Sequence, residues 1–208
     1  VLLTGGRVKI GYATALKFLR ANANLLVTTR FPALAMQQFS REPDFEKWQN
    51  QLTIYWLDLR NIKAVNSFIT FTNKHFHSLD ILINNAAQTI KYTDDYYRPM
   101  IANENRLLQM STGSWNLISN ETPVTDEVKG LKEDAHETDI ELNRFGQPVD
   151  IRQKNSWNST LEEVELTELL EVNLINQIAP YMLIKELLPL MKASGFHRKF
   201  IINVTSSE

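Results

Sequence analysis

The chain of 208 residues contains no cysteine. This absence excludes a disulfide-bonded scaffold and any metal site built from thiolates. No apolar run approaches the roughly 18–20 residues that a membrane helix requires. No basic segment followed by an apolar stretch indicates a secretory signal. We therefore expect a cytoplasmic protein without membrane contact, although a lack of cysteine fits any compartment.

An excess of one charge is also absent, since the formal net charge is −2. Nothing in this balance favours nucleic-acid binding. The charge is unevenly spread, because residues 91–165 contain 15 acidic and 8 basic residues and the remainder is mildly basic. A mildly basic remainder of the chain would favour binding of an anionic cofactor, although this charge distribution could equally arise by chance. His75 and His77 have no carboxylate cluster at metal-ligand spacing beside them, so we expect no metal site.

Apolar runs alternate with helical periodicity over the first 90 residues. We expect strands at 1–3, 25–29, 52–57 and 79–83, separated by helices over 10–21, 33–50 and 61–76. These strands are apolar enough to be covered on both faces, which is typical of parallel sheets. The alternation predicts a Rossmann-like α/β fold, a doubly wound parallel sheet in three layers (α/β/α).

The pattern changes after residue 90. Residues 91–160 are polar and acidic without a clean period, and a hairpin over 142–151 is conceivable. A structureless loop of this length is improbable in a compact domain, so we expect an inserted subdomain or lid near the active-site end. The aromatic side chains of the insert could stack against a substrate, although packing within the insert is the favoured alternative; they are Tyr92, Tyr96, Tyr97 and Trp115.

Residues 161–192 return to strong helical periodicity with a wide apolar face. Pro180 predicts a kink or break in this helix, and a further strand opens at Phe200. We interpret 1–208 as a single domain, truncated at both ends, that carries the insertion.

The segment Val1–Gly11, VLLTGGRVKIG, predicts a strand, a glycine turn and the start of a helix. Backbone N–H groups and the helix dipole at such a start bind phosphate well. Glycine is needed where a side chain would block an approaching pyrophosphate. A plain strand-to-helix turn remains the alternative.

This turn resembles the Thr-Gly-x-x-x-Gly-x-Gly turn of short-chain dehydrogenases/reductases. Thr4, Gly5 and Gly11 match it, whereas Lys9 stands where the family has its middle glycine and places a cation beside the expected phosphates. The resemblance implies that the turn contacts a nicotinamide cofactor through Thr4, Gly5, Gly6, Arg7, Lys9, Ile10 and Gly11.

Two further strand ends resemble family motifs. Asn84-Asn85-Ala86-Ala87 is similar to Asn-Asn-Ala-Gly, which borders the cofactor, and Asp58-Leu59 is similar to the acidic pair near the adenine. The resemblance implies cofactor contacts by Asp58, Leu59, Asn85, Ala86 and Ala87. A structural role for the asparagines and a helix N-cap or turn role for Asp58 are the alternatives.

Arg30 follows the second expected strand. In a dinucleotide-binding fold, the residue at this position contacts the adenosine ribose and distinguishes NAD from NADP. An acidic side chain there binds the 2′-OH of NAD, whereas an arginine pairs with the 2′-phosphate of NADP. The sequence offers Thr28-Thr29-Arg30 without a nearby acid, which favours NADP(H) and leaves NAD(H) possible. The alternative is a solvated surface arginine.

Two catalytic residues are implied by the resemblance. Asn173, in Glu171-Val172-Asn173-Leu174, is similar to the family's helix asparagine that supports the proton relay. Ser206 is similar to the serine that orients the substrate carbonyl, and Ser207 is the alternative position for that serine. The alternatives are an amide at Asn173 that is hydrogen-bonded in the core or exposed to solvent, and a simple turn at Ser206.

The resemblance covers about residues 1–90 and 161–208, with its motifs in the family's order. It implies hydride transfer between NADP(H) and a small carbonyl or alcohol substrate, and a homo-oligomer formed through the helix at 166–192. The family's Tyr-x-x-x-Lys pair is expected beyond Glu208, so we expect this fragment to be inactive and its longer parent active.

Two other classes of function remain open. The parent could be a non-catalytic NADP(H)-binding regulator, since Lys9, Ala87 and the insert depart from the family pattern. It could instead be an interaction module that docks partners through the acidic insert.

Overall fold

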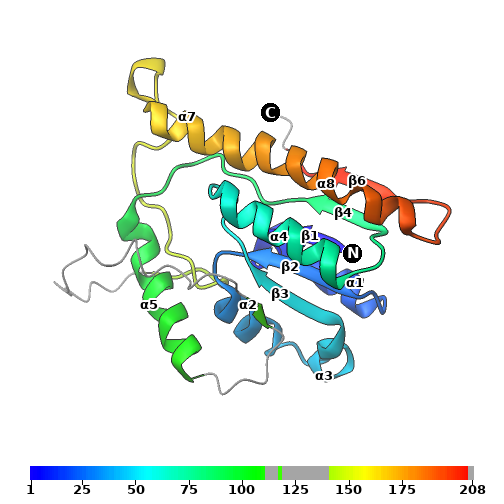
Figure 1. Ribbon diagram of the computed structural model, residues 1–208. Helices are drawn as coiled ribbons and strands as arrows, with labels where there is room; N and C mark the ends of the chain where they lie inside the picture. Colours follow the sequence, from blue (N-terminus) through cyan, green and yellow to red (C-terminus); the bar gives the residue numbers. More distant parts are fainter. Residues whose placement is uncertain (111–116, 119–140, 206–208) are drawn as a thin grey trace.

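The computed structural model describes residues 1–110, 117–118 and 141–205, and it forms a parallel sheet with helices on both sides (Figure 1). The strand order is β5-β3-β2-β1-β4-β6. The strands are β1 (Leu2–Thr4), β2 (Leu25–Thr29), β3 (Leu52–Trp56), β4 (Ile81–Asn84), β5 (Leu117–Ile118) and β6 (Phe200–Asn203). The chain therefore winds outward from β1 in both directions, and the predicted doubly wound α/β fold is confirmed.

The helices connect these strands. They are α1 (Lys9–Arg20), α2 (Pro32–Phe39), α3 (Phe45–Trp48), α4 (Ile62–His75), α5 (Asp94–Met110), α7 (Leu166–Asn173) and α8 (Ala179–Ala193), with short 3₁₀ turns at Gln49–Gln51 and Leu161–Glu163 and a π-helical segment at Leu174–Ile178. Among the described residues, no helix is both long and apolar enough to cross a membrane.

Two cores form because alternate strand residues point to opposite faces of the sheet. In β1, Leu2 belongs to the cluster that contains the buried faces of α4 and α8, whereas Leu3 belongs to the cluster beneath α1 and α2. The central strands therefore read as continuous apolar runs rather than as alternating patterns. Phe68 of α4 is fully buried, and its truncation to alanine would cost about 3–5 kcal/mol.

Helix α5 lies where the sequence showed no clean period, so the sequence did not predict this helix. Pro99 stands inside the helix, and the buried face includes Glu104 between Ile101 and Leu107. A proline and a buried charge together hide the apolar stripe that marks a helix in a sequence. Helix α5 packs against α2, so this part of the expected insertion is joined to a layer of the main fold.

Two other parts of the insertion are also joined to the body. Strand β5 pairs with β3 and extends the edge of the sheet. The conceivable hairpin over 142–151 is a tight turn with one antiparallel bridge between Leu142 and Pro148. The Asn143 side chain accepts hydrogen bonds from the backbone N–H groups of Phe145 and Gln147 and so holds this turn.

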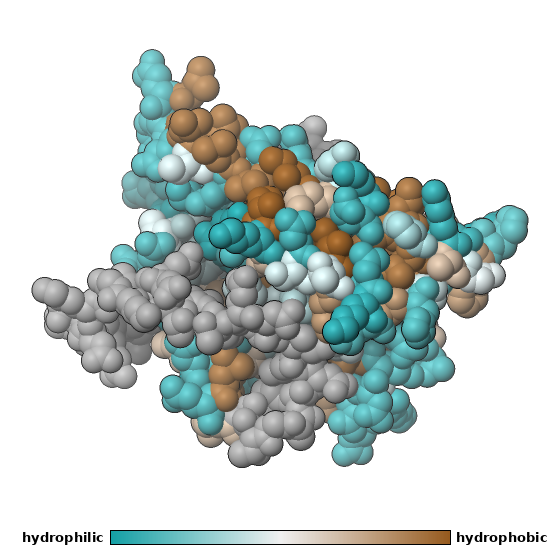
Figure 2. All heavy atoms as spheres, in the orientation of Figure 1, coloured by the Kyte–Doolittle hydropathy of each residue, from teal (hydrophilic) through white to brown (hydrophobic). Residues whose placement is uncertain are grey.

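The long helix expected over 161–192 is interrupted before Pro180. The π-helical segment separates α7 from α8, and Pro180 lies in the first turn of α8, where a missing N–H costs little. Helix α8 packs against α4, whereas α7 buries none of its residues. Leu166, Leu169 and Leu170 are each more than half exposed, and Figure 2 shows hydrophobic residues gathered along α7 and α8.

Candidate cofactor cleft

A cavity of about 810 Å³ lies where the first four strands end. Parallel α/β sheets bind ligands at this edge, outside the carboxyl ends of their strands. Of the site residues predicted from the sequence, the cavity is lined by Gly5, Arg7, Lys9, Ile10, Gly11, Arg30, Asp58, Leu59, Asn85, Ala86 and Ala87. Thr4 and Gly6 are buried and do not line it. Ser206 and Ser207 lie outside the described residues.

A side chain would clash with backbone atoms at two positions of the glycine turn. Gly5 has a φ of +68°, and a Cβ there would lie 2.9 Å from the Ala86 Cα. A Cβ on Gly11 would lie 2.1 Å from the carbonyl oxygen of Gly5. Glycine at both positions lets the turn close against β4 and start helix α1 at the floor of the cleft.

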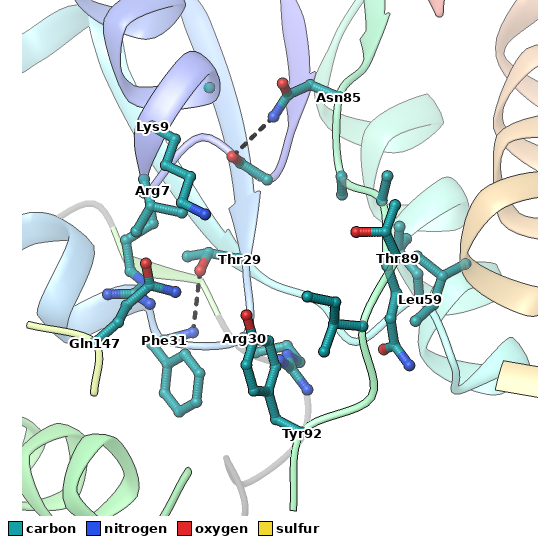
Figure 3. A pocket seen from close by; sticks show the side chains of 18 of the residues that line it. Arg7, Lys9, Thr29, Arg30, Phe31, Leu59, Asn85, Thr89, Tyr92 and Gln147 are labelled. Atoms are coloured by element: carbon teal, nitrogen blue, oxygen red, sulfur yellow. Dashed lines mark hydrogen bonds between the residues drawn. The ribbon is translucent and has the colours of Figure 1, made fainter. Parts of the chain in front are cut away.

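Lys9 adopts the left-handed backbone conformation that glycine usually provides, with a φ of 50°. The turn therefore has a positive φ at this position although the residue differs from the family pattern. Its side chain is exposed and lies at the rim of the cavity near Arg7 (Figure 3). An exposed cation is thus available at the helix start, where phosphate binding is favoured.

Asn85 connects the end of β4 to the glycine turn. Its side-chain amide donates to the carbonyl oxygens of Thr4 and Gly5, both at 3.1 Å. The Thr4 hydroxyl oxygen in turn accepts from the backbone N–H groups of Asn85 and Ala86, both at 3.0 Å. These bonds give Asn85 a structural role and fix the two loops that form the floor of the cleft.

Asp58 is ionised and held by Arg60. The Arg60 Nη2 lies 2.6 Å from the Asp58 Oδ2, and the Arg60 N–H also donates to the carboxylate. Burial acts to raise the pKa of Asp58, but the bonds and charge of Arg60, with a smaller effect of Arg30, place that pKa below its ordinary value. A carboxylate has further lone pairs, so Asp58 can still accept a bond from a ligand.

Arg30 is half-buried directly after β2. Its guanidinium carbon lies 4.5 Å from the ring centroid of Tyr97 and 5.7 Å from that of Phe31. Of the described acidic residues, Asp58 and Asp150 line the cavity, and neither comes from the end of β2. At the end of β2 the cleft therefore presents a cation held by aromatic rings.

Arg7 has a role that its position in the turn did not indicate. It is only 6% exposed, and it donates to the Phe145 carbonyl oxygen at 3.0 Å and to the Met100 sulfur at 3.6 Å. Burial lowers its pKa to about 10, although nearby Glu104 opposes this effect. Arg7 thus joins the turn to the insertion, and this role could not be predicted because its partners are far away in the sequence.

The insertion forms one wall of the cleft. Tyr92, Tyr96, Tyr97, Gln147 and Asp150 all line the cavity, and Figure 3 shows Tyr92 and Gln147 facing the predicted cofactor residues. The tyrosines were visible in the sequence as candidates for stacking. Gln147 carried no sequence signal, because it stands in a polar turn that only the fold places at the cavity.

The structure places Asn176, not Asn173, against the segment that follows β4. Asn173 donates to the Leu169 carbonyl oxygen within its own helix at 2.8 Å, and neither Asn173 nor Asn176 lines the cavity. Asn176 lies in the π-helical segment, accepts from the Gln88 N–H and donates to the Gln88 carbonyl oxygen, both at 2.9 Å. Segments of π-helix are frequent at functional sites.

Tyr181 and Lys185 have the spacing of a Tyr-x-x-x-Lys pair but the wrong position. Tyr181 is 64% exposed on α8 and does not line the cavity. Lys185 lies 3.2 Å from the Glu186 carboxylate. Spacing alone therefore does not make these two residues part of the cleft.

Comparisons with protein families and with curated proteins both find relatives of this chain. A family model described as short chain dehydrogenase matches residues 1–105. A curated relative, uncharacterized protein R665 of Acanthamoeba polyphaga mimivirus, is 29% identical over 218 residues, which cover 100% of this chain and 44% of the relative. The chain therefore spans less than half the length of that relative.

Solved structures with the same fold include several oxidoreductases. A metagenomic short-chain oxidoreductase in complex with NADP has a TM-score of 0.60 and 17% identity, covering 100% of this chain and 62% of its own. The Pseudomonas aeruginosa RhlG/NADP active-site complex has a TM-score of 0.56 and 17% identity, with 97% and 52% covered. Menthone neomenthol reductase from Mentha piperita has a TM-score of 0.54 and 17% identity, with 99% and 60% covered.

Proposed function

The chain belongs to the short-chain dehydrogenase family, and from this membership we propose that it forms the NADP(H)-binding part of an oxidoreductase. The proposed reaction transfers a hydride between the cofactor and a small carbonyl or alcohol substrate. Two of the structural relatives are complexes with NADP, which supports a nicotinamide cofactor with NADP(H) favoured over NAD(H). The activity of the whole protein belongs to this proposal, because the chain spans 44% of its curated relative.

One observation carries the proposal. The glycine turn, Arg30, Asp58 and the Asn85–Ala86 segment come from four different strand ends, and all of them face one cavity. Such convergence is what a dinucleotide requires, because its phosphates, ribose and adenine need separate partners. The position after β2 holds Arg30 rather than an acid, which favours a cofactor with a 2′-phosphate.

Each of these residues has a proposed task. The turn from Gly5 to Gly11 would receive the pyrophosphate with Lys9 as a counter-charge. Arg30 would pair with the 2′-phosphate, and Asp58 would accept a hydrogen bond from the adenine. When bound, the nicotinamide supplies or accepts the hydride.

Two catalytic roles complete the proposal, although Asn173 does not line the cavity and Ser206 lies outside the described residues. Ser206 would hydrogen-bond the substrate oxygen, and Asn173 would support the proton relay. The contacts of Asn176 with Gln88 and its π-helical setting make it a second candidate for that supporting role.

Titration of the purified chain with NADPH and NADH, followed by nicotinamide fluorescence, tests the proposal. The wild type should bind NADPH more tightly than NADH. Arg30→Gln should weaken NADPH binding by about 10- to 100-fold, because a charged hydrogen bond contributes about 1.5–3 kcal/mol, and should change NADH binding little. Arg198→Gln, an exposed arginine outside the cleft, is the matched control. If the wild type bound neither nucleotide, the cofactor assignment would be wrong.

A further inference from the structure

The described part of the insertion is fixed to the cofactor half of the fold at its helix. The Glu104 carboxylate of α5 accepts from the backbone N–H groups of Ala33 at 2.7 Å and Leu34 at 2.8 Å. Glu104 is 1% exposed. Two of the free N–H groups that begin α2 are thereby satisfied from within the protein, and they are not open to a ligand phosphate. Recognition of an anion at this end of the cleft then depends on side chains.

A second attachment joins the same helix to the glycine turn. Arg7 contacts Met100 of α5 and the Phe145 carbonyl oxygen, and its guanidinium carbon lies 5.3 Å from the ring centroid of Phe31. Met100 is 1% exposed. Helix α5 is therefore held at both the α2 start and the turn, which fixes the residues that it presents to the cleft.

Tyr97 is the residue of α5 that contacts Arg30. Its ring lies parallel to that of Phe31, with an interplanar angle of 24° and centroids 6.5 Å apart, and the Arg30 guanidinium lies against both. Tyr97 is itself braced edge-on by Tyr96 at 5.2 Å and Tyr92 at 6.2 Å. An aromatic face attracts a guanidinium and limits its conformations.

We propose that Tyr97 is a positioning residue for cofactor specificity: its ring, with that of Phe31, holds Arg30 at the ribose end of the cleft, so that the insertion sets the preference for NADP(H) over NAD(H). This inference rests on the proposed function of Arg30 as the partner of the 2′-phosphate. The acidic insertion then has a defined task in the cofactor site, because it supplies the surface that orders the arginine.

The test compares 2′,5′-ADP with 5′-AMP, and NADPH with NADH, by isothermal titration to the whole chain. Each pair differs only in the 2′-phosphate, so the ratio of affinities reports its recognition, and 5′-AMP binding reports an intact fold. Tyr97→Leu should lower this ratio by roughly three- to thirtyfold, the range of a cation–π contact. Tyr97→Phe keeps the ring face and should leave the ratio within about twofold of wild type.

Two controls make the result specific. Tyr181→Leu removes an exposed tyrosine outside the cleft and should leave the ratio unchanged. In an Arg30→Gln background, Tyr97→Leu should have no further effect, because the residue that it positions is gone. If Tyr97→Leu does not fold, Tyr97→Met provides an unbranched apolar replacement without a ring face.

The possible outcomes separate the two claims. An unchanged ratio in Tyr97→Leu or Tyr97→Met, while Arg30→Gln lowers it, would overturn the role of Tyr97 and leave Arg30 as the partner of the 2′-phosphate. A ratio that is insensitive to Arg30→Gln would overturn both claims. A loss in Tyr97→Leu that persists in the Arg30→Gln background would assign Tyr97 to the ligand itself and contradict positioning through Arg30.

Discussion

At the scale of single residues, Lys9 combines two opposing properties. Its backbone has a φ of 50°, a conformation that costs a residue with a side chain about 1–2 kcal/mol. Its exposed ammonium lines the cavity beside the helix start. A strained residue with a useful charge is typical of a functional site rather than of a packing position.

Lys9→Gly should therefore separate stability from binding. We expect the free energy of unfolding to rise by up to about 1 kcal/mol, because glycine adopts the left-handed conformation without strain. We expect affinity for NADPH and NADH to fall about equally, since the pyrophosphate is common to both. Urea denaturation and nucleotide titration measure the two effects.

Lys17→Ala, on the exposed side of the same helix, is the control for this variant and should leave nucleotide affinity unchanged. A Lys9→Gly variant that lost only NADPH affinity would place the lysine at the ribose instead of the pyrophosphate.

The sequence predicted which turn forms the site but not where every side chain in it points. Glycine positions follow from local geometry, so Gly5 and Gly11 could be identified at once. Arg7 could not, because its acceptor on Phe145 lies 138 residues away. Asn173 matched a motif, yet the π-helical segment that follows it places Asn176 against Gln88.

At the scale of elements, the junction of α5 with α2 contains one buried carboxyl group beside its apolar cluster. Burial raises the pKa of Glu104 above its ordinary value of 4.5, and the N–H groups of Ala33 and Leu34 and the charge of Arg7 only partly oppose this. Since the pKa in the folded state is the higher one, the stabilisation linked to protonation is present below about pH 4.5 and is lost as the pH rises through the folded-state value.

Glu104→Gln should remove this dependence on pH. From pH 4.5 upward, the free energy of unfolding of the wild type should fall relative to that of Glu104→Gln, until Glu104 is fully ionised in the folded state. Urea denaturation at a series of pH values measures the difference. Glu162→Gln, at an exposed acid, should follow the wild-type profile, and a Glu104→Gln profile parallel to wild type would contradict the assignment.

Strands β1 to β4, β6 and most helices could be predicted because each contains an apolar pattern, whereas the two-residue strand β5 was not expected. Helix α5 could not, since its buried face includes Glu104, whose partner Ala33 is 71 residues away. The irregular segment before Pro180 was expected, but a π-helical turn has no pattern of its own in the sequence.

At the scale of the whole molecule, the exposed apolar face of α7 supports the expectation of a homo-oligomer formed through residues 166–192. Leu166, Leu169 and Leu170 are each at least half exposed, and a face of this kind gains stability when it is covered.

Leu170→Asp should weaken self-association at least tenfold, since burying one leucine contributes about 1.5–3 kcal/mol. Sedimentation of the wild type and of the variant over a range of concentrations measures this. Leu188→Asp, at an exposed leucine of α8, tests how far the contact extends along the helix. A wild type that remained monomeric at about 100 μM, near the affinity of weak contacts, would contradict the expectation.

The order of layers could be predicted for the whole molecule, because alternating strands and helices allow few topologies. The place of the insertion could not be predicted, since it is set by Glu104, Arg7 and β5, whose contacts join distant segments of the chain.

The most direct measurement is a crystal structure of this chain with NADP⁺. We predict the pyrophosphate against the turn from Gly5 to Gly11 and the 2′-phosphate within hydrogen-bond distance of Arg30, with the guanidinium still against Tyr97. A dinucleotide bound with its 2′-phosphate away from Arg30, or a cleft that stays closed to the nucleotide, would contradict the account.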